Sequence, residues 1–196
     1  MFEPQIREDD MLQFPPLPTW DSLHPLIVHF PIALLLLSPL FILISAIPPP
    51  PKGKPYMIAA LVILVLGTVS LFIAGSTGHA ASELAERGGA VDAVLEAHED
   101  LASETQIVFA GLSAILLGMY LIPLVLRRQE NRLFSTFLPT AFLALYSVGF
   151  LFLVNTAHAG GRLVHEFGIH AVMPAANHQS PGPDDPLRAD KDTEAH

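Results

Sequence analysis

Cysteine is missing from the chain altogether. Its absence excludes disulfides, iron–sulfur clusters, thiolate metal sites and the covalent attachment of c-type haem within this chain. Nine histidines stand beside only ten lysines and arginines, a high proportion for histidine. Histidine is therefore the leading candidate ligand for any metal or haem.

Charge is also scarce. Charged residues make up 15% of the chain, against about 25% in soluble domains, whereas 51% of residues are hydrophobic and the mean hydropathy is +0.47. The net charge of −9 argues against nucleic acid as a partner. The first twenty residues have neither a basic region nor a small-residue cleavage site, so we expect the first apolar segment to act as its own insertion signal.

Four apolar runs are long enough to cross a hydrocarbon core of about 30 Å, which takes about 20 helical residues. They contain no Asp, Glu, Lys or Arg and lie near residues 25–47, 56–76, 107–126 and 134–156. The expected fold is all-α, an integral membrane four-helix bundle. We expect an extended N-terminal segment at 1–20, a four-span membrane domain at 21–172 and a disordered tail at 173–196.

Two short connectors hold half of the basic side chains and set the expected orientation. The basic residues in them are Lys52, Lys54, Arg127, Arg128 and Arg132. The positive-inside rule places these connectors in the cytoplasm, and both termini and the 77–106 loop on the other side. The sequence therefore predicts a multi-pass protein of a bacterial inner membrane with both termini in the periplasm.

The 77–106 loop reads as two short amphipathic helices broken at Gly88–Gly89. His98 falls on the apolar stripe of the second, opposite a face of acidic residues, so we expect it to face the protein interior. No convincing internal repeat is visible along the chain.

Seven histidines from four helix ends are expected to gather at the periplasmic face. We predict that His29, His98, His158 and His165 are the best candidate haem ligands; His24, His79 and His170 are secondary candidates, and Arg162 could pair with a propionate. Bis-histidine ligation needs ligands on facing helices, and this arrangement could supply one or two such sites. The metal would be the haem iron, bound through these same histidines.

Each of these residues also has a simpler interpretation. His24 could cap the first helix beside Pro25, His98 could be a hydrogen-bonded core residue, and Arg162 could meet lipid phosphate. The glycines at 67, 75, 78 and 160–161 either let a flat macrocycle approach the backbone or serve ordinary helix packing.

Three motifs resemble those of a bacterial family of four-span membrane proteins that are predicted to bind haem. They are LHPLIVHFPIALLL at 23–36, HEDLA at 98–102 and AHAGGRLVHEFG at 157–168, and the resemblance covers residues 20–172. It implies a b-type haem module, often fused or adjacent to c-type cytochrome domains, and extends to His24, His29, His98, His158 and His165. Ala157 departs from the family pattern, which has glycine there, and many members have tyrosine at the position of His165.

The sequence therefore favours an electron-transfer subunit that holds one or two non-covalent haem b groups. Its expected partners are the lipid bilayer and a periplasmic c-type cytochrome or another subunit of a membrane redox complex. Two alternatives stay open: a cofactor-free structural subunit and a histidine-based Cu or Zn module. No enzyme is expected, because neither a Ser-His-Asp set, an H-E-x-x-H motif nor a phosphate-binding loop is visible.

Overall fold

The structure is a computed structural model that describes residues 18–85, 88–126 and 133–169. Every element in these ranges is a helix, and all of them belong to one compact unit, residues 20–172. The tail at 173–196, nearly all of the segment at 1–20, His170 and the arginines of the second connector lie outside the described residues.

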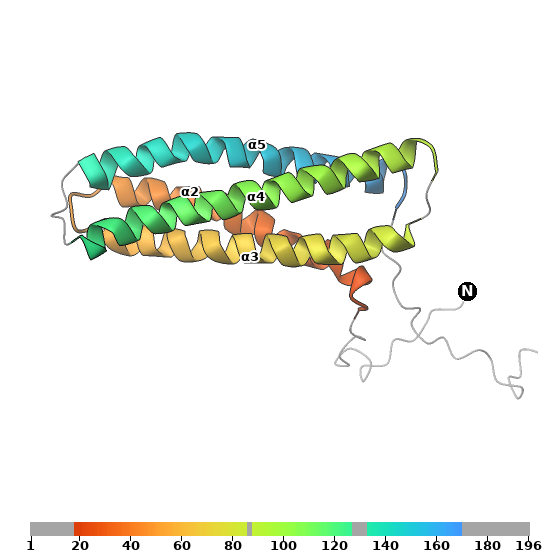
Figure 1. The fold of residues 1–196 in the computed structure, drawn as a ribbon, viewed down its shortest axis with the longest axis horizontal. Helices are drawn as coiled ribbons and strands as arrows, with labels where there is room; N and C mark the ends of the chain where they lie inside the picture. The colour runs from red at the N-terminus through yellow and green to blue at the C-terminus, as the bar shows by residue number, and fades with distance from the viewer. Residues whose placement is uncertain (1–17, 86–87, 127–132, 170–196) are drawn as a thin grey trace, which may run out of the picture. The chain divides into compact units, whose positions relative to one another are not determined.

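Four stretches of helix are long and apolar enough to cross a membrane, as the sequence predicts. In the first, η2 and α1 lead into α2, and in the last, η3 leads into α5 (Figure 1). The elements in chain order are η2 (Asp21–Leu23), α1 (His24–Ile27), α2 (His29–Ala46), α3 (Lys54–Leu84), α4 (Ala90–Val125), η3 (Leu133–Phe137) and α5 (Leu138–His165).

Proline marks where several of these helices begin or bend. α1, α3 and α5 each have proline in the first turn, where the missing N–H costs nothing because it would have no intrahelical partner. Pro31 has the opposite effect, since it cannot donate to the carbonyl of Ile27. The first span is accordingly interrupted at Val28, between α1 and α2.

The predicted amphipathic helices of the 77–106 loop are continuous with the membrane spans rather than separate. α3 has 31 residues and α4 has 36, so at 1.5 Å per residue they reach about 46 Å and 54 Å, well beyond the hydrocarbon core. Between Gly78 and Gly88 the sequence contains no helix breaker, nor between Gly89 and Thr105. The break occurs at Gly89, whose φ of 60° belongs to the left-handed region that favours glycine.

The four long helices pack in a ring, α2 beside α3, α3 beside α4, α4 beside α5 and α5 beside α2. In the described part of the chain, no Cα atom of α1 or α2 comes within 8 Å of a Cα atom of α4. We call α1, α2 and α3 the first hairpin, and α4 and α5 the second. The histidine end of the bundle is the end where His24 begins α1 and His165 ends α5.

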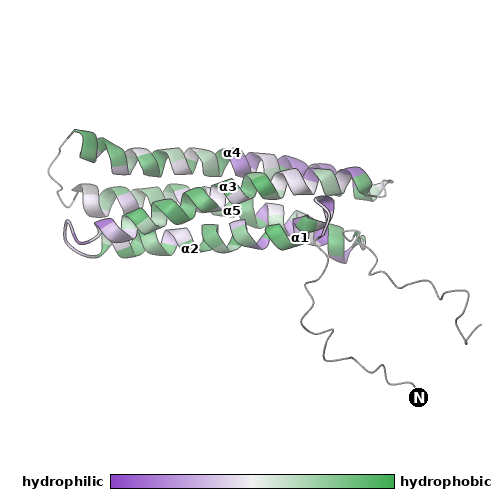
Figure 2. Cartoon of the chain, turned by 90° about the horizontal axis from the view of Figure 1, so that it is seen from below, coloured by the Kyte–Doolittle hydropathy of each residue, from purple (hydrophilic) through white to green (hydrophobic). Residues whose placement is uncertain are grey.

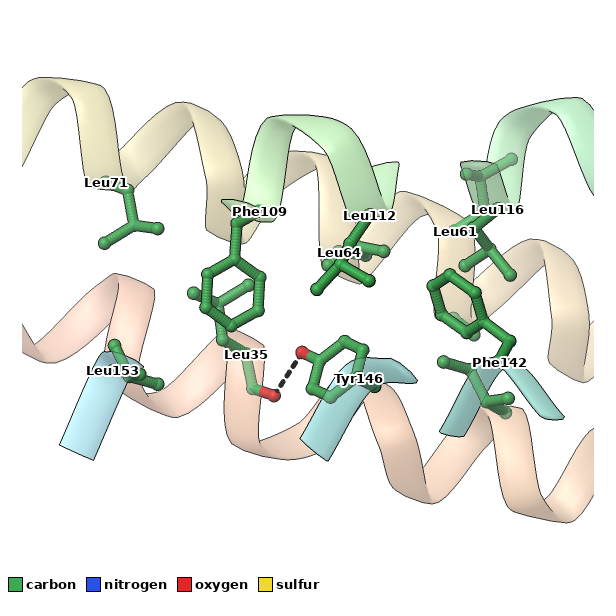
Figure 3. Packing of buried hydrophobic residues seen from close by; sticks show 12 residues of the cluster. Leu35, Leu61, Leu64, Leu71, Phe109, Leu112, Leu116, Phe142, Tyr146 and Leu153 are labelled. Carbon is green, nitrogen blue, oxygen red and sulfur yellow. Dashed lines mark hydrogen bonds between the residues drawn. The ribbon is translucent and has the colours of Figure 1, made fainter. Parts of the chain in front are cut away.

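The core runs along the middle of the bundle and draws on all four long helices (Figure 3). Phe109 packs edge-on against Tyr146 with ring centroids 5.5 Å apart. The Tyr146 hydroxyl donates to the carbonyl of Leu35 at 2.7 Å, which satisfies a buried phenol and joins α5 to α2. A second bond between these two segments of the chain lies near the opposite end, where Thr136 donates to the carbonyl of Ala46 at 3.2 Å.

The outward faces of the helices are largely apolar, as lipid contact requires (Figure 2). The first turns of α4 are the exception and are hydrophilic in Figure 2. Their exposed acidic side chains are Asp92, Glu96, Asp100 and Glu104. The polar part of α4 therefore continues past the apolar span toward the aqueous side of the histidine end.

Candidate functional site

His24 turns into the first hairpin. The cap of α1 is Leu23, without a side-chain cap bond, so His24 does not act as a cap. Its Nδ1 lies 2.9 Å from the carbonyl oxygen of Ala74 on α3 and 3.2 Å from the hydroxyl of Thr77. Because a carbonyl can only accept, Nδ1 carries the proton and donates to Ala74.

Gly78 makes room for this ring. A Cβ atom at position 78 would lie 2.9 Å from Cε1 of His24. That distance is too short for unstrained contact, so the imidazole can rest against α3 because residue 78 is glycine. The predicted role of Gly78 in close approach is thus filled by a histidine side chain of the neighbouring helix.

His98 does the same in the second hairpin. Its Nδ1 lies 3.0 Å from the carbonyl oxygen of Thr156 on α5, and again the nitrogen must donate. A Cβ atom at Gly160 would lie 3.0 Å from Cε1 of the His98 ring. The inward orientation predicted from the apolar stripe of α4 is confirmed.

These bonds determine the tautomer of both rings. With the proton on Nδ1, the lone pair is on Nε2, and neither Nε2 atom forms a hydrogen bond with another described residue. A histidine that binds a metal usually donates its other ring N–H to a carbonyl or carboxylate, which fixes the ring and raises its basicity. Each of the two rings therefore presents the lone pair of a neutral imidazole on Nε2.

The two rings belong to helices that do not touch, because α1 and α4 share no Cα pair within 8 Å among the described residues. Each ring turns toward the other long helix of its own hairpin, His24 toward α3 and His98 toward α5. Bis-histidine binding of a haem needs donors on facing helices of a bundle.

The other predicted ligands lie on the outside of the bundle. His29, His79, His158 and His165 are exposed in the described chain, so the structure does not bring them together with His24 and His98. His79 lies 3.7 Å from the carboxylate of Glu83 and 4.0 Å from that of Glu99. Their role as ligands stays a prediction, and His170 lies outside the described residues.

Arg162 is paired within its own helix. Its Nε donates to both carboxylate oxygens of Glu166, at 3.1 and 2.9 Å, one turn further along α5. Gly168 then ends this region with a φ of 67°, its N–H donating to the carbonyl of Val164 at 3.2 Å. A contact between Arg162 and a propionate stays a prediction.

Within residues 18–85, 88–126 and 133–169, no group of three or more His, Asp or Glu side chains could hold a metal ion. Among the histidines described, His24 and His98 are the two that turn inward with Nδ1 bonded to a carbonyl. From the sequence, His24 is a secondary candidate, whereas the structure turns its ring inward against α3. The sequence signals for the two inward rings are Gly78 near the end of α3 and Gly160 near the end of α5, against which the rings of His24 and His98 lie.

The chain matches a known protein family. The model of a family described as predicted membrane proteins, DUF2231, matches residues 21–173. The chain belongs to the DUF2231 family. The DUF2231 match includes His24 and His98 and the glycines that accommodate their rings, Gly78 and Gly160. No curated protein and no solved structure matches this DUF2231 chain.

Proposed function

We propose that this protein is a membrane electron-transfer subunit that binds b-type haem non-covalently at its histidine end. The observation that carries the proposal is the pair His24 and His98, two inward imidazoles with Nδ1 bonded to a carbonyl and Nε2 left for a metal. When bound, haem supplies reversible one-electron chemistry. The chain itself supplies the axial nitrogens, their orientation and a partly dry environment.

The carbonyls of Ala74 and Thr156 act as positioning groups in this proposal. Each holds an imidazole in one tautomer and one rotamer, so the ring loses little freedom when Nε2 binds iron. Thr105 supports this arrangement in the second hairpin, because its hydroxyl lies 2.8 Å from the hydroxyl of Thr156, whose carbonyl holds the His98 ring. We assign no catalytic residue, and the subunit acts as a carrier.

The orientation follows from the first connector in the same proposal. Lys52 and Lys54 lie at the end of the bundle opposite the histidines, so the positive-inside rule places the histidine end at the periplasmic face of a bacterial inner membrane. A single site on that side cannot pass electrons across the bilayer by itself. Electrons would therefore be exchanged with a periplasmic partner, for which a c-type cytochrome is the class we propose.

The start of α4 favours a basic partner. Its exposed carboxylates beside His98 create a negative potential that accelerates encounter with a positively charged protein. A cationic soluble c-type cytochrome should be reduced by the haem-loaded protein at a rate that falls as ionic strength rises. Glu96→Lys should lower that rate at low salt by severalfold, whereas a rate independent of salt and of this variant would contradict the partner assignment.

A spectrum of the purified protein tests the proposal directly. Protein from haem-replete cells should show the reduced-minus-oxidised bands of b-type haem, extractable without covalent attachment. His24→Ala and His98→Ala should each lose haem or its low-spin bands. His158→Ala is the matched control, because His158 is exposed on the helix that positions His98. A colourless, iron-free preparation would sink the proposal, and haem loss in the control alone would favour the ligands predicted from sequence.

One alternative is favoured by a specific observation. The bond from His24 to Ala74 also joins α1 to α3, and the bond from His98 to Thr156 joins α4 to α5, as a cofactor-free structural subunit would need. That function predicts a stable, colourless protein in which His24→Ala and His98→Ala lower the unfolding free energy. The haem function predicts that the same variants change absorbance first.

A further inference from the structure

The buried positions of the two hairpins follow one register. Adding 74 to the number of an inward residue of α1 or α2 gives the number of an inward residue of α4. His24 and His98 are related in this way. The buried residues related in this way are Pro31 to Thr105, Leu35 to Phe109, Ser38 to Leu112 and Ile42 to Leu116.

The second helices show the same relation with a shift of 82. It relates Gly78 to Gly160, and the carbonyl of Ala74 to that of Thr156, which are the groups that hold the two rings. Its buried pairs are Ala60 to Phe142, Leu64 to Tyr146, Gly67 to Gly149, Leu71 to Leu153 and Thr77 to Ala159.

Contacts between the helices repeat as well. Gly67 receives Leu35 within the first hairpin, with its ideal Cβ 2.7 Å from a leucine methyl. The equivalent Gly149 receives the equivalent Phe109 at 3.3 Å within the second hairpin, and also Leu112 at 2.7 Å. Between hairpins, the carbonyl of Leu35 accepts from α5 at 2.7 Å, and the equivalent carbonyl of Phe109 accepts from Thr68 on α3 at 3.4 Å. Helix α2 therefore corresponds to α4, and α3 to α5.

We infer that the four-helix unit consists of two equivalent hairpins related by a pseudo-two-fold axis along the bundle, and that His24 and His98 hold one haem on that axis. Groups related by a two-fold axis lie on opposite sides of it at equal distances. Both rings turn from their own helices into the bundle, His24 against α3 and His98 against α5, so the axis passes between them. One iron between them would use both Nε2 lone pairs, whereas a separate haem at each ring would need a second ligand from elsewhere in the chain.

The amino acids kept between the hairpins support this assignment. Most of the paired inward residues differ in type, but the pairs His24–His98, Gly67–Gly149, Leu71–Leu153 and Gly78–Gly160 are identical. The ring and the glycine that accommodates it are thus kept while most of the surrounding core varies. The difference between the two shifts is eight residues, and together with the unlike core side chains it explains why the sequence shows no convincing internal repeat.

The inference rests on the proposed haem function and is tested on the full chain by counting iron and by substituting each ring. We expect one iron and one extractable haem per chain. His24→Gly and His98→Gly should each convert a low-spin spectrum to a high-spin one, and added imidazole should restore the low-spin bands in both. Asn155→Gly, at an exposed position of α5 to which no ligand role is assigned, serves as the control and should leave the spectrum unchanged.

Two results would overturn the shared site while leaving haem binding intact: two irons per chain, or low-spin bands that persist in either single variant. A colourless wild-type protein would instead contradict the proposed function itself. Should a glycine variant fail to accumulate, His24→Met and His98→Met keep a ligand at each position. Both should then raise the reduction potential, as methionine ligation does, and a shift in only one of them would also overturn the inference.

Discussion

The two hairpins place the same side chain by different means. In the first, Pro31 interrupts the helix at Val28, and His24 lies on the short segment before the break. In the second, Thr105 stands in the place of Pro31, its hydroxyl bonds the carbonyl of Leu101 at 2.6 Å, and α4 continues straight. Each histidine nevertheless bonds a carbonyl that lies one turn before a glycine. His24 bonds Ala74, before Gly78 on α3, and His98 bonds Thr156, before Gly160 on α5. What the hairpins share is the ring, the carbonyl and the glycine, and not the shape of the helix that carries the ring.

The hairpins also differ in what lies beyond the ring. His24 is the first residue of α1, whereas α4 begins at Ala90, eight residues before His98. Those residues and the turns that follow carry four exposed carboxylates, those of Asp92, Glu96, Asp100 and Glu104. The described part of the first hairpin has the exposed carboxylate of Glu83 at this end. The acidic surface beside the rings therefore belongs mainly to the second hairpin.

The largest effect should come from filling the glycines at mid-bundle. Gly67→Ala and Gly149→Ala each overpack the core, which costs about 1–3 kcal/mol. Gly67→Ala should lie at the upper end, because its Cβ also meets Cβ of Leu34 at 3.2 Å, whereas Gly149 meets only the ends of side chains. Reversible unfolding in mixed micelles measures both. Gly111→Ala is the control with open space around it, and equal stability of all three variants would contradict equivalent packing.

The link between the hairpins should matter for stability but not for the site. Gly89→Ala forces an L-residue into the left-handed region at a φ of 60°, at a cost of roughly 1–2 kcal/mol. The haem spectrum should stay unchanged, because each hairpin holds its own ring. Gly88→Ala, without a positive φ, is the matched control. A spectral change in Gly89→Ala would show that the link positions the ligands.

Methyl groups under the rings should weaken haem binding equally in the two hairpins. Gly78→Ala and Gly160→Ala would each push an imidazole away by a few tenths of an ångström, and loss of such positioning costs about tenfold in metal affinity. Haem transfer to an apo-myoglobin acceptor gives the affinity. Gly161→Ala, adjacent to Gly160 but in open space, should have no effect. A loss in only one of the two hairpins would break the comparison.

The smallest effect should come from the hydrogen bonds between hairpins. Tyr146→Phe removes the bond to the carbonyl of Leu35, and such bonds average about 0.6 kcal/mol in membranes. Thr68→Val should cost less, because its bond to Phe109 is longer and Thr68 also donates within its own helix. Unfolding free energies in the same micelles test this order, and a larger loss for Thr68→Val would reverse it.

The four spans, and their ends away from the histidines, were predictable because length and missing charge determine them. His98 was predictable too, since helical spacing placed it on an apolar stripe. The inward position of His24 was not, because it depends on the bend before Pro31 and on which face of α3 presents Gly78. The extent of α3 and α4 was underestimated because the change from apolar to polar residues was interpreted as an end, although no helix breaker occurs there.

The bonds between α2 and the segment that contains α5 have a further consequence. Tyr146 bonds Leu35 near mid-bundle, and Thr136 bonds Ala46 at the end away from the histidines. In the described chain, the rest of the contact between α2 and α5, toward the histidine end, is side-chain packing alone. Parting these two helices there would break van der Waals contacts and no hydrogen bond between them. Under the proposed haem function, this is the side on which we expect a flat, apolar molecule to enter from the lipid after the four helices have assembled.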